Sequence, residues 1–290
     1  MVRAAICRQP WRDRMNQSER AAYFRQLHTE RPLILPNAWD AVSARIIELA
    51  GAKAIATTSA GVSWTYGQRD GETLRREQML QTVRQIVEAV DIPVSADVES
   101  GYGSGSPEDV AETVRTLIGI GAVGINLEDS PGRDGETLLT PDAHAERIRA
   151  ARQAASSKRG DIVINARIDV FLFQVGAPET RLAEAVRRAN VYRAAGADCL
   201  FVPGVIDVPT ITALVHDIDG PVNIMAMHGA PNAAALGKLG VARVSVGPAI
   251  AQVALGATRR AAVELLERGT YGAPEDSVSF AEANGMFAKR

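Results

Sequence analysis

Short apolar runs alternate with longer amphipathic segments through most of the chain. The runs are rich in β-branched residues and have the length of buried strands. Eight of them span Leu33 to Pro36, Ala54 to Thr58, Val94 to Val98, Gly124 to Leu127, Ile162 to Ile168, Cys199 to Val202, Val222 to Met227 and Val244 to Val246. The segments between them have helical spacing, and several open with a proline or close with a glycine.

This alternation predicts an α/β fold, a (β/α)8 TIM-type barrel in which eight parallel strands are surrounded by helices. An open, doubly wound sheet is the main alternative. Its phosphate-binding turn needs a glycine spacing that Gly101, Gly103 and Gly105 do not have. We therefore favour the closed barrel.

The alternation continues without a linker, so we expect the 290 residues to form a single domain. The barrel should cover about residues 31–269. A helix at residues 17–30, with Ser18 as its N-cap, should lie over one end of the barrel. The irregular tail at residues 270–290 is expected to fray or to pack on a neighbouring subunit.

The segment PVSADVESGYG at residues 93–103 is the strongest candidate for the functional site. Side chains alternate between the two faces of a strand, which predicts that Asp97 and Glu99 point the same way. Two neighbouring carboxylates repel each other, and either a bound cation or nearby arginines would stabilise them. The glycines that follow let the backbone turn tightly beside a ligand.

The carboxyl ends of the strands, where such barrels have their active sites, carry many polar residues. In chain order these are Ser59, Arg69, Asp70, Asp97, Glu99, Glu128, Asp129, Asn165, Arg167, Asp169 and His228. Several carboxylates without histidine or cysteine on the same strand ends predict a hard divalent cation, Mg²⁺ or Mn²⁺, and not zinc.

Arg167 stands among these acids and predicts an anionic substrate, because its guanidinium can hold a carboxylate through two parallel hydrogen bonds. The turn formed by Ser59, Ala60 and Gly61 can offer backbone N–H groups to another oxygen. A metal that binds a 2-oxo or 2-hydroxy acid would stabilise the enolate left when a neighbouring bond breaks. The pattern favours carbon–carbon cleavage.

The composition narrows the range of partners. Hydrophobic residues make up 46% of the chain, charged residues make up 23%, and the net charge is −2. We expect a water-soluble protein with small-molecule partners and no nucleic-acid or membrane binding. Cys7 and Cys199 are the only cysteines, which fits a reducing cytoplasm. An imine-forming aldolase is disfavoured, since the lysines lie away from the strand ends.

Taken together, the motifs resemble the isocitrate lyase and phosphoenolpyruvate mutase superfamily. The resemblance runs from about Leu33 to Gly269 through LPNAWDAVSARI, TTSAG, GQRDGE, ADVESGYG, INLEDS and INARID, in the family's order. It implies an α/β barrel that binds Mg²⁺ and a 2-oxo acid. It also implies a homotetramer, a dimer of dimers in which a C-terminal helix is exchanged between subunits.

The resemblance also assigns metal ligands. Asp97 matches the family's metal-binding aspartate, and Glu99 and Glu128 would support the metal and its waters. Glu99 stands where the family usually has an aspartate, and its extra methylene moves the carboxylate by about 1.5 Å. Its metal contact is therefore expected to be direct or rearranged.

The substrate-binding residues follow in the same way. The Ser59–Gly61 turn matches the family's grip on the substrate's carboxylate and oxo groups, and Arg167 matches its arginine. Asn165 lies on the same strand face as Arg167, so we place it beside the substrate. Asp70 matches the acidic residue of the second loop.

Two departures from the family pattern narrow the activity. The loop DSPGRDGETLLTP lacks the catalytic cysteine of isocitrate and methylisocitrate lyases, which disfavours those reactions. Ser130 replaces the lysine of the mutase and of phosphonopyruvate hydrolase, which weakens phosphorus–carbon chemistry. The chain then resembles the branch that contains oxaloacetate decarboxylases and dialkylmalate lyases. His228 is either an acid or substrate contact, because its pKa suits proton transfer, or a structural turn residue.

We therefore predict a Mg²⁺-dependent carbon–carbon lyase or decarboxylase acting on a small 2-oxo or 2-hydroxy dicarboxylate through a metal-stabilised enolate. Asp70, Arg167 and His228 are the predicted catalytic residues, and Asp129 to Leu139 should close over the site. Phosphonopyruvate hydrolase or mutase chemistry and a catalytically inactive 2-oxo acid binding protein remain the alternatives.

Overall fold

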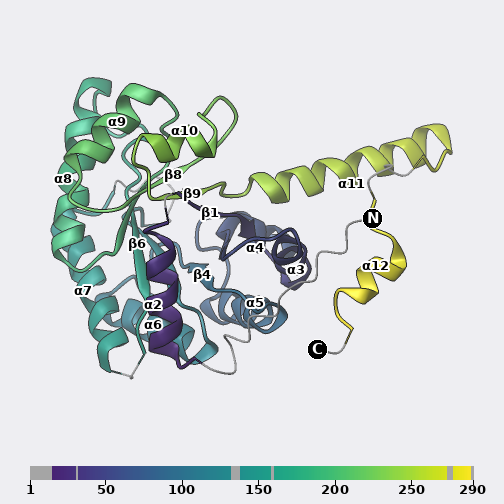
Figure 1. Cartoon of the computed structure of the whole chain (residues 1–290), viewed down its shortest axis with the longest axis horizontal. Helices are drawn as coiled ribbons and strands as arrows, with labels where there is room; N and C mark the ends of the chain where they lie inside the picture. Colours follow the sequence, from purple (N-terminus) through teal and green to yellow (C-terminus); the bar gives the residue numbers. More distant parts are fainter. Residues whose placement is uncertain (1–14, 31, 132–137, 158–159, 273–276, 289–290) are drawn as a thin grey trace.

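Parallel strands form one continuous sheet at the centre of the molecule (Figure 1). The computed structural model describes residues 15–30, 32–131, 138–157, 160–272 and 277–288. The strands are β1 (Leu33–Leu35), β2 (Asn37–Ala38), β3 (Ile55–Thr57), β4 (Val94–Asp97), β5 (Gly124–Glu128), β6 (Val163–Arg167), β7 (Cys199–Val202), β8 (Val222–Met225) and β9 (Arg243–Ser245). Their order in the sheet is β1-β9-β8-β7-β6-β5-β4-β3-β2, and every neighbouring pair is parallel.

The sheet closes into a barrel because β1 and β2 are two halves of one strand, broken at Pro36. The first half pairs with β9 and the second half pairs with β3. Proline has no N–H to give to a ladder, but the carbonyl oxygen of Pro36 accepts a hydrogen bond from Ala56 N at 3.1 Å. The predicted α/β barrel of parallel strands is confirmed, with its first strand divided in two.

Helices follow the strands around the outside of the barrel. They are α2 (Gln17–Leu27), α3 (Ala41–Leu49), α4 (Ser59–Thr65), α5 (Arg76–Ala89), α6 (Pro107–Ile120), α7 (Pro141–Ser157), α8 (Arg181–Ala194), α9 (Val208–Asp217), α10 (Ala233–Lys238), α11 (Ala249–Arg268) and α12 (Phe280–Gly285), with a 3-10 turn at Pro178–Thr180. In the described part of the chain, none of them has both the length and the apolar character needed to cross a bilayer.

Helix α2 covers the amino-terminal end of the barrel, as predicted, but its first residue differs. Asn16 is the N-cap: its side chain accepts from Glu19 N at 3.0 Å, and the Glu19 carboxylate accepts from Asn16 N at 2.7 Å. The prediction of Ser18 as N-cap is therefore wrong, because this reciprocal pair satisfies two N–H groups at once. Phe24 lies so close to Gly124 that a Cβ on the glycine would stand 2.7 Å from the Phe24 ring.

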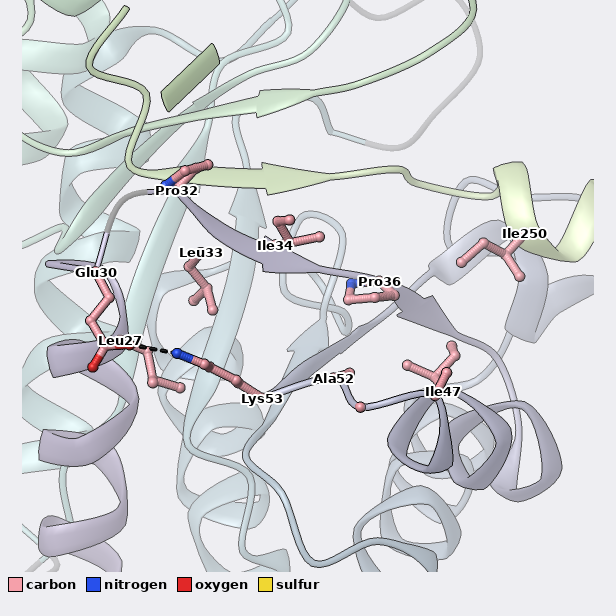
Figure 2. Close-up of a pocket in the computed structure, with 12 residues that line it drawn as sticks. Leu27, Glu30, Pro32, Leu33, Ile34, Pro36, Ile47, Ala52, Lys53 and Ile250 are labelled. Carbon is pink, nitrogen blue, oxygen red and sulfur yellow. Dashed lines mark hydrogen bonds and ion pairs between the residues drawn. The ribbon is translucent and has the colours of Figure 1, made fainter. Parts of the chain in front are cut away.

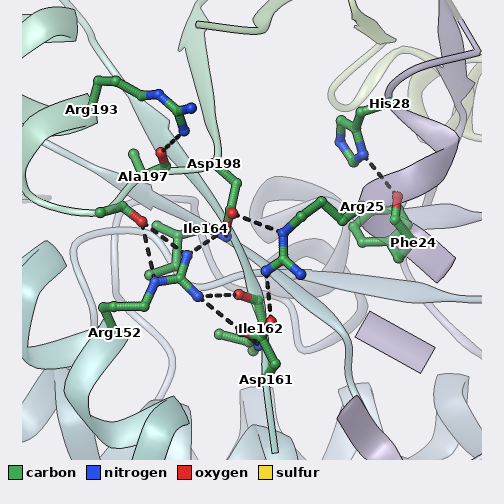
Figure 3. A network of polar contacts seen from close by, with 11 residues as sticks. Phe24, Arg25, His28, Arg152, Asp161, Ile162, Ile164, Arg193, Ala197 and Asp198 are labelled. Atoms are coloured by element: carbon green, nitrogen blue, oxygen red, sulfur yellow. Dashed lines mark hydrogen bonds and ion pairs between the residues drawn. The ribbon is translucent and has the colours of Figure 1, made fainter. Parts of the chain in front are cut away.

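An ion-pair network fixes α2 to the loops at this end (Figure 3). Arg25 binds Asp198 at 3.0 Å and Asp161 at 2.8 Å. Arg152 of α7 binds the same two acids, and Asp198 also accepts from Ile164 N at 2.8 Å. Active sites of such barrels lie at the carboxyl ends of the strands. This network therefore stabilises the amino-terminal end of the barrel and leaves the carboxyl end free for ligands.

The last long helix leaves the barrel instead of packing on it (Figure 1). Helix α11 extends away from β9, and large apolar residues along it, such as Leu255 and Leu266, are exposed. The tail predicted to be irregular contains α12, whose N-cap is Ser279. Arg45 of α3 donates to Met286 O at 3.0 Å, so this part of the tail contacts the body of the same chain.

Two buried histidines make the stability of the fold depend on pH. Burial, followed by the charge of Arg243, lowers the pKa of His28 to about 4, and burial lowers the pKa of His144 to about 3. Both are neutral in the folded protein, so below about pH 6.5 the unfolded chain binds protons that the folded chain does not. Their stabilising contribution is complete above this pH and is lost as the pH falls toward about 4 for His28 and toward about 3 for His144.

We expect His144→Leu to reduce the pH dependence of the free energy of unfolding by about 1.4 kcal/mol per pH unit between pH 6 and 4. Urea unfolding at several pH values measures this slope. His228→Gln, which changes an exposed histidine, is the control and should keep the wild-type slope. An unchanged slope in the His144 variant would mean that this ring is protonated in the folded state.

Candidate active site

Three neighbouring strands bring the predicted site residues together at the carboxyl end of the barrel. Asp97, Glu128 and Arg167 are the last residues of β4, β5 and β6. These strands are adjacent, and Glu128 is the direct cross-strand partner of Arg167. The strand register therefore places Arg167 beside Glu128, with Asp97 one strand further on, before any loop contributes.

Asp97 is buried, and its two carboxylate oxygens differ. Oδ2 accepts from the backbone N–H of Ser59 at 3.1 Å, and the N–H of Asp97 donates to the Thr57 hydroxyl at 2.8 Å. No donor in the described part of the chain reaches Oδ1, although this atom is also buried. An ionised oxygen without a partner is costly inside a protein, so Oδ1 is available to a cation or a ligand.

Glu99 lies near Asp97 but does not follow the strand alternation that the sequence suggested. The strand ends at Asp97, and Glu99 has a left-handed backbone with φ of 50°. Its carboxylate accepts from the Tyr102 hydroxyl at 2.9 Å and from the N–H of Glu72. The prediction of a shared strand face is wrong here, because a left-handed residue redirects the chain.

A strained turn holds these groups. Glu72, Glu99 and Tyr102 have positive φ of 54°, 50° and 64°, which side-chain-bearing residues rarely adopt. The Glu72 carboxylate accepts from Ser100 N at 2.8 Å, from the Ser100 hydroxyl at 2.6 Å and from Tyr102 N at 3.1 Å. Glu72 and Tyr102 were not identified as site residues from the sequence, although both lie inside the GQRDGE and ADVESGYG motifs.

Arg167 is held between two carboxylates. Its Nη1 lies 2.5 Å from Glu128 Oε2, and its Nε donates to Asp169 Oδ1 at 2.7 Å. The side chain of Arg167 is 16% exposed, so it is not wholly sealed inside the barrel. A guanidinium has five N–H donors, which leaves donors for an anionic ligand.

Asp129 serves the scaffold. Its Oδ2 accepts from Arg188 at 3.0 Å and from the Tyr192 hydroxyl at 2.8 Å, and its Oδ1 accepts from Asp169 N at 2.9 Å. Arg188 also donates to Leu139 O at 2.8 Å, so both ends of the segment after β5 are fixed. The predicted closing segment, Asp129 to Leu139, lies for the most part outside the described residues.

Burial and mutual repulsion make the acids hold their protons more tightly. Burial, with the charges of Asp70 and Asp97, raises the pKa of Glu99 to about 8. Burial likewise raises the pKa of Asp70, with Asp97 adding to it, and raises that of Asp169 to about 6 against the opposing charge of Arg167. The pKa of Glu128 also rises through burial. The folded site therefore disfavours the ionised forms of these acids unless further positive charge is brought to them.

The Ser59–Gly61 turn forms the first turn of α4. The Ser59 hydroxyl hydrogen-bonds the Asp70 carboxylate, which places the two loops side by side. Ser59 N already donates to Asp97 Oδ2, so the N–H groups of Ala60 and Gly61 are the ones in this turn that are left for an anion. Gly61 also has a packing role, because a Cβ there would stand 2.7 Å from the Cβ of Trp39.

Asn165 and His228 lie differently from the other predicted residues. Asn165 is fully buried in the barrel interior and donates from Nδ2 to Asn126 Oδ1 at 2.7 Å. His228 is exposed in the loop after β8, and no hydrogen bond or ion pair joins it to the acids within the described residues. Their contact with a substrate stays a prediction.

The residues fit a divalent cation held mainly by one carboxylate. Within the described ranges, no three His, Cys, Asp or Glu side chains stand close enough to enclose a metal by themselves. Asp97 offers the unpartnered buried oxygen, while Glu99 and Glu128 are engaged by Tyr102 and Arg167. Mg²⁺ suits this arrangement because it keeps several waters and needs few protein ligands. Direct ligation by Glu99 and Glu128 stays a prediction.

An α/β barrel with buried acids and an arginine at the carboxyl ends of its strands has the architecture typical of an enzyme. Residues 24–266 match the phosphoenolpyruvate phosphomutase family. The chain therefore belongs to the phosphoenolpyruvate mutase and isocitrate lyase superfamily, whose members are lyases or mutases.

Individual relatives agree with this assignment. An uncharacterized protein of Mycobacterium tuberculosis (strain CDC 1551 / Oshkosh) is 37% identical and covers 77% of this chain and 81% of its own length. The 2,3-dimethylmalate lyase of Eubacterium barkeri is 33% identical, over 63% of this chain and 62% of that enzyme. A solved structure from Burkholderia cenocepacia J2315, described as a lyase or mutase, superposes with a TM-score of 0.86 at 39% identity, covering 94% of this chain and 97% of that one.

Proposed function

We propose that this protein is a Mg²⁺-dependent lyase that cleaves or decarboxylates a small 2-oxo or 2-hydroxy dicarboxylate. The observation that carries the proposal is the buried Oδ1 of Asp97, which has no partner among the described residues, in the same barrel mouth as the partly exposed side chain of Arg167. One group suits a cation and the other suits a carboxylate. The similarity to 2,3-dimethylmalate lyase supports this substrate class.

Arg167 binds one carboxylate of the substrate in this proposal. Glu128 and Asp169 hold its guanidinium from two sides, so the fork is oriented before the ligand arrives. The backbone N–H groups of Ala60 and Gly61 would receive a second anionic oxygen, since that of Ser59 is bonded to Asp97. The substrate is then fixed at both ends, with the bond to be broken between them.

Mg²⁺, which members of the superfamily typically use, would bind at Asp97 and supply positive charge that favours an enolate over the intact acid. For a 2-hydroxy acid, the hydroxyl proton must leave as the C–C bond breaks, and the electron pair of that bond goes to the carbon next to the departing carboxylate, which then takes up a proton. For a 2-oxo acid that loses CO₂, the electron pair moves toward the oxo group, and the carbon then takes up a proton in the same way. Asp70 is our candidate for holding this proton, because burial raises its pKa and it is bonded to Ser59 beside the predicted substrate.

With Mg²⁺ present, we expect oxaloacetate or a substituted malate to be converted, with pyruvate as the 2-oxo product. 2,3-Dimethylmalate would give pyruvate and propionate. Arg167→Lys should lower kcat/KM at least about 100-fold, because lysine keeps the charge but loses the planar fork. A coupled assay for pyruvate measures this.

Arg187→Lys is the matched control, since Arg187 is exposed on α8 and bonds only Glu184 among the described acids. Its kcat/KM should equal that of the wild type, and thermal unfolding should confirm that both variants fold. Phosphate released from phosphonopyruvate would replace the proposal with phosphorus–carbon chemistry. Tight binding of oxalate without turnover of any acid would instead indicate a binding protein.

We also propose that the protein forms a homo-oligomer, a dimer of dimers, in which α11 packs on a second copy. A cavity of about 500 Å³ opens beside β1, with residues of α2, α3 and α11 among its lining (Figure 2). Ile34, Pro36, Ile47 and Ile250 line it, and Ile34 is 55% exposed. Leu266 on the projecting α11 is apolar and 84% exposed, so it suits the apolar cavity of a second copy.

Light scattering should therefore report a tetramer for the wild type. Ile34→Glu, in the cavity, and Leu266→Glu, on α11, should each shift the protein to smaller species, because a buried unpaired charge opposes association. Glu267→Gln, on the same exposed stretch of α11, should leave the tetramer intact. A monomeric wild-type protein would contradict the proposed exchange.

A further inference from the structure

The largest wholly buried side chain described in this protein is a cation. Arg243, the first residue of β9, has an exposed fraction of 0%. Bulky branched apolar residues usually fill the interior of an α/β barrel. Arginine is almost never fully buried unless it is paired, so its position here needs a physical reason.

The Arg243 side chain crosses the barrel. In the sheet order, β9 and β5 are four places apart, which in a closed barrel of eight strand positions puts them on opposite walls. Nevertheless, Arg243 Nη2 donates to the Oδ1 of Asn126, on β5, at 3.1 Å. The Cα of Asn126 is in turn paired with that of Asp97. The guanidinium therefore lies in the barrel interior, one strand away from the residue that offers the free carboxylate oxygen.

The same contact organises two amides beneath the barrel mouth. Asn126 Oδ1 accepts both from Arg243 and from Asn165 Nδ2, the latter at 2.7 Å. Asn126 precedes Glu128 by two residues on β5, and Asn165 precedes Arg167 by two residues on β6. Arg243 thus supports the two strands whose ends carry the Glu128–Arg167 pair.

The fold itself gains little from the Arg243 charge. Arg188 and Arg167, the other deeply placed arginines discussed above, both bind carboxylates. For Arg243, by contrast, neither Nε nor Nη1 meets an acceptor in the described ranges. Burial lowers the pKa of Arg243 to about 10, so the group is still charged at neutral pH. A buried cation without an ion pair opposes folding, and replacing such a group by an apolar one is often stabilising.

We propose that Arg243 is a positioning residue of the active site, a fixed internal cation that orients Asn126 and Asn165 and favours a dianionic ligand at the barrel mouth. The inference rests on the proposed function, because it takes this ligand to be a small dicarboxylate. A fixed charge in a low-dielectric interior acts over a longer range than one in water. Arg243 therefore acts on the ligand without touching it.

Titration of oxalate into the Mg²⁺-loaded protein tests this directly. Arg243→Met keeps the length of the side chain and removes the charge, and we expect it to bind oxalate about tenfold more weakly. Its unfolding temperature should equal or exceed that of the wild type. Arg243→Lys keeps the charge and should retain most of the oxalate affinity. Arg193→Met, which removes an exposed cation bonded to Ala197 O, is the matched control and should bind as the wild type does.

Wild-type affinity in Arg243→Met would overturn the inference while leaving the proposed function intact. A parallel loss of oxalate binding and thermal stability in both Arg243 variants would also overturn it, since that result assigns the residue to the fold. If Arg243→Met does not fold, Arg243→Lys decides alone: tenfold weaker binding by the folded lysine variant counts against a role for charge. A wild-type protein that binds neither oxalate nor any 2-oxo acid would overturn the proposed function and this inference with it.

Discussion

The confinement of several acids at the mouth of a closed barrel is the constraint on which the rest of the site depends. Strands β4, β5 and β6 end side by side, so Asp97, Glu128 and Arg167 must meet there. Burial and repulsion oppose the ionised state, as the raised pKa values of Glu99 and Asp169 indicate. Positive groups of different kinds offset this: an arginine, backbone N–H groups and, in our account, a divalent cation.

The loops around this cluster store strain where a ligand would bind. Glu72 accepts three hydrogen bonds from the turn after β4, and it holds that turn in a left-handed conformation. Such a conformation persists only when surrounding contacts fix it. The Glu99 carboxylate is thereby held by Tyr102 and Glu72 and kept close to Asp97. The strain is consistent with a site that is organised before the substrate arrives.

The sequence predicted the barrel and the meeting of Asp97, Glu128 and Arg167 at its mouth, because both depend on local patterns. Apolar runs mark the strands, and strand ends mark the mouth. The prediction from sequence failed mainly where the local structure depends on contacts between distant segments. The left-handed turn at Glu99 is stabilised by Glu72 from another loop. The N-cap at Asn16 is a local exception, because its reciprocal contact with Glu19 lies only three residues away. The predicted last strand began at Val244 and missed Arg243, because its partner lies on the opposite wall of the barrel.

Diffraction from crystals grown with Mn²⁺ tests the central claim most directly, since anomalous scattering locates this metal independently of any assumed mechanism. Our account predicts a peak within coordination distance of Asp97 Oδ1, about 2.1 Å for an ion of this kind, and no peak in Asp97→Asn. A strong peak elsewhere, or a wild-type barrel mouth without Mn²⁺ at saturating concentration, would contradict the account.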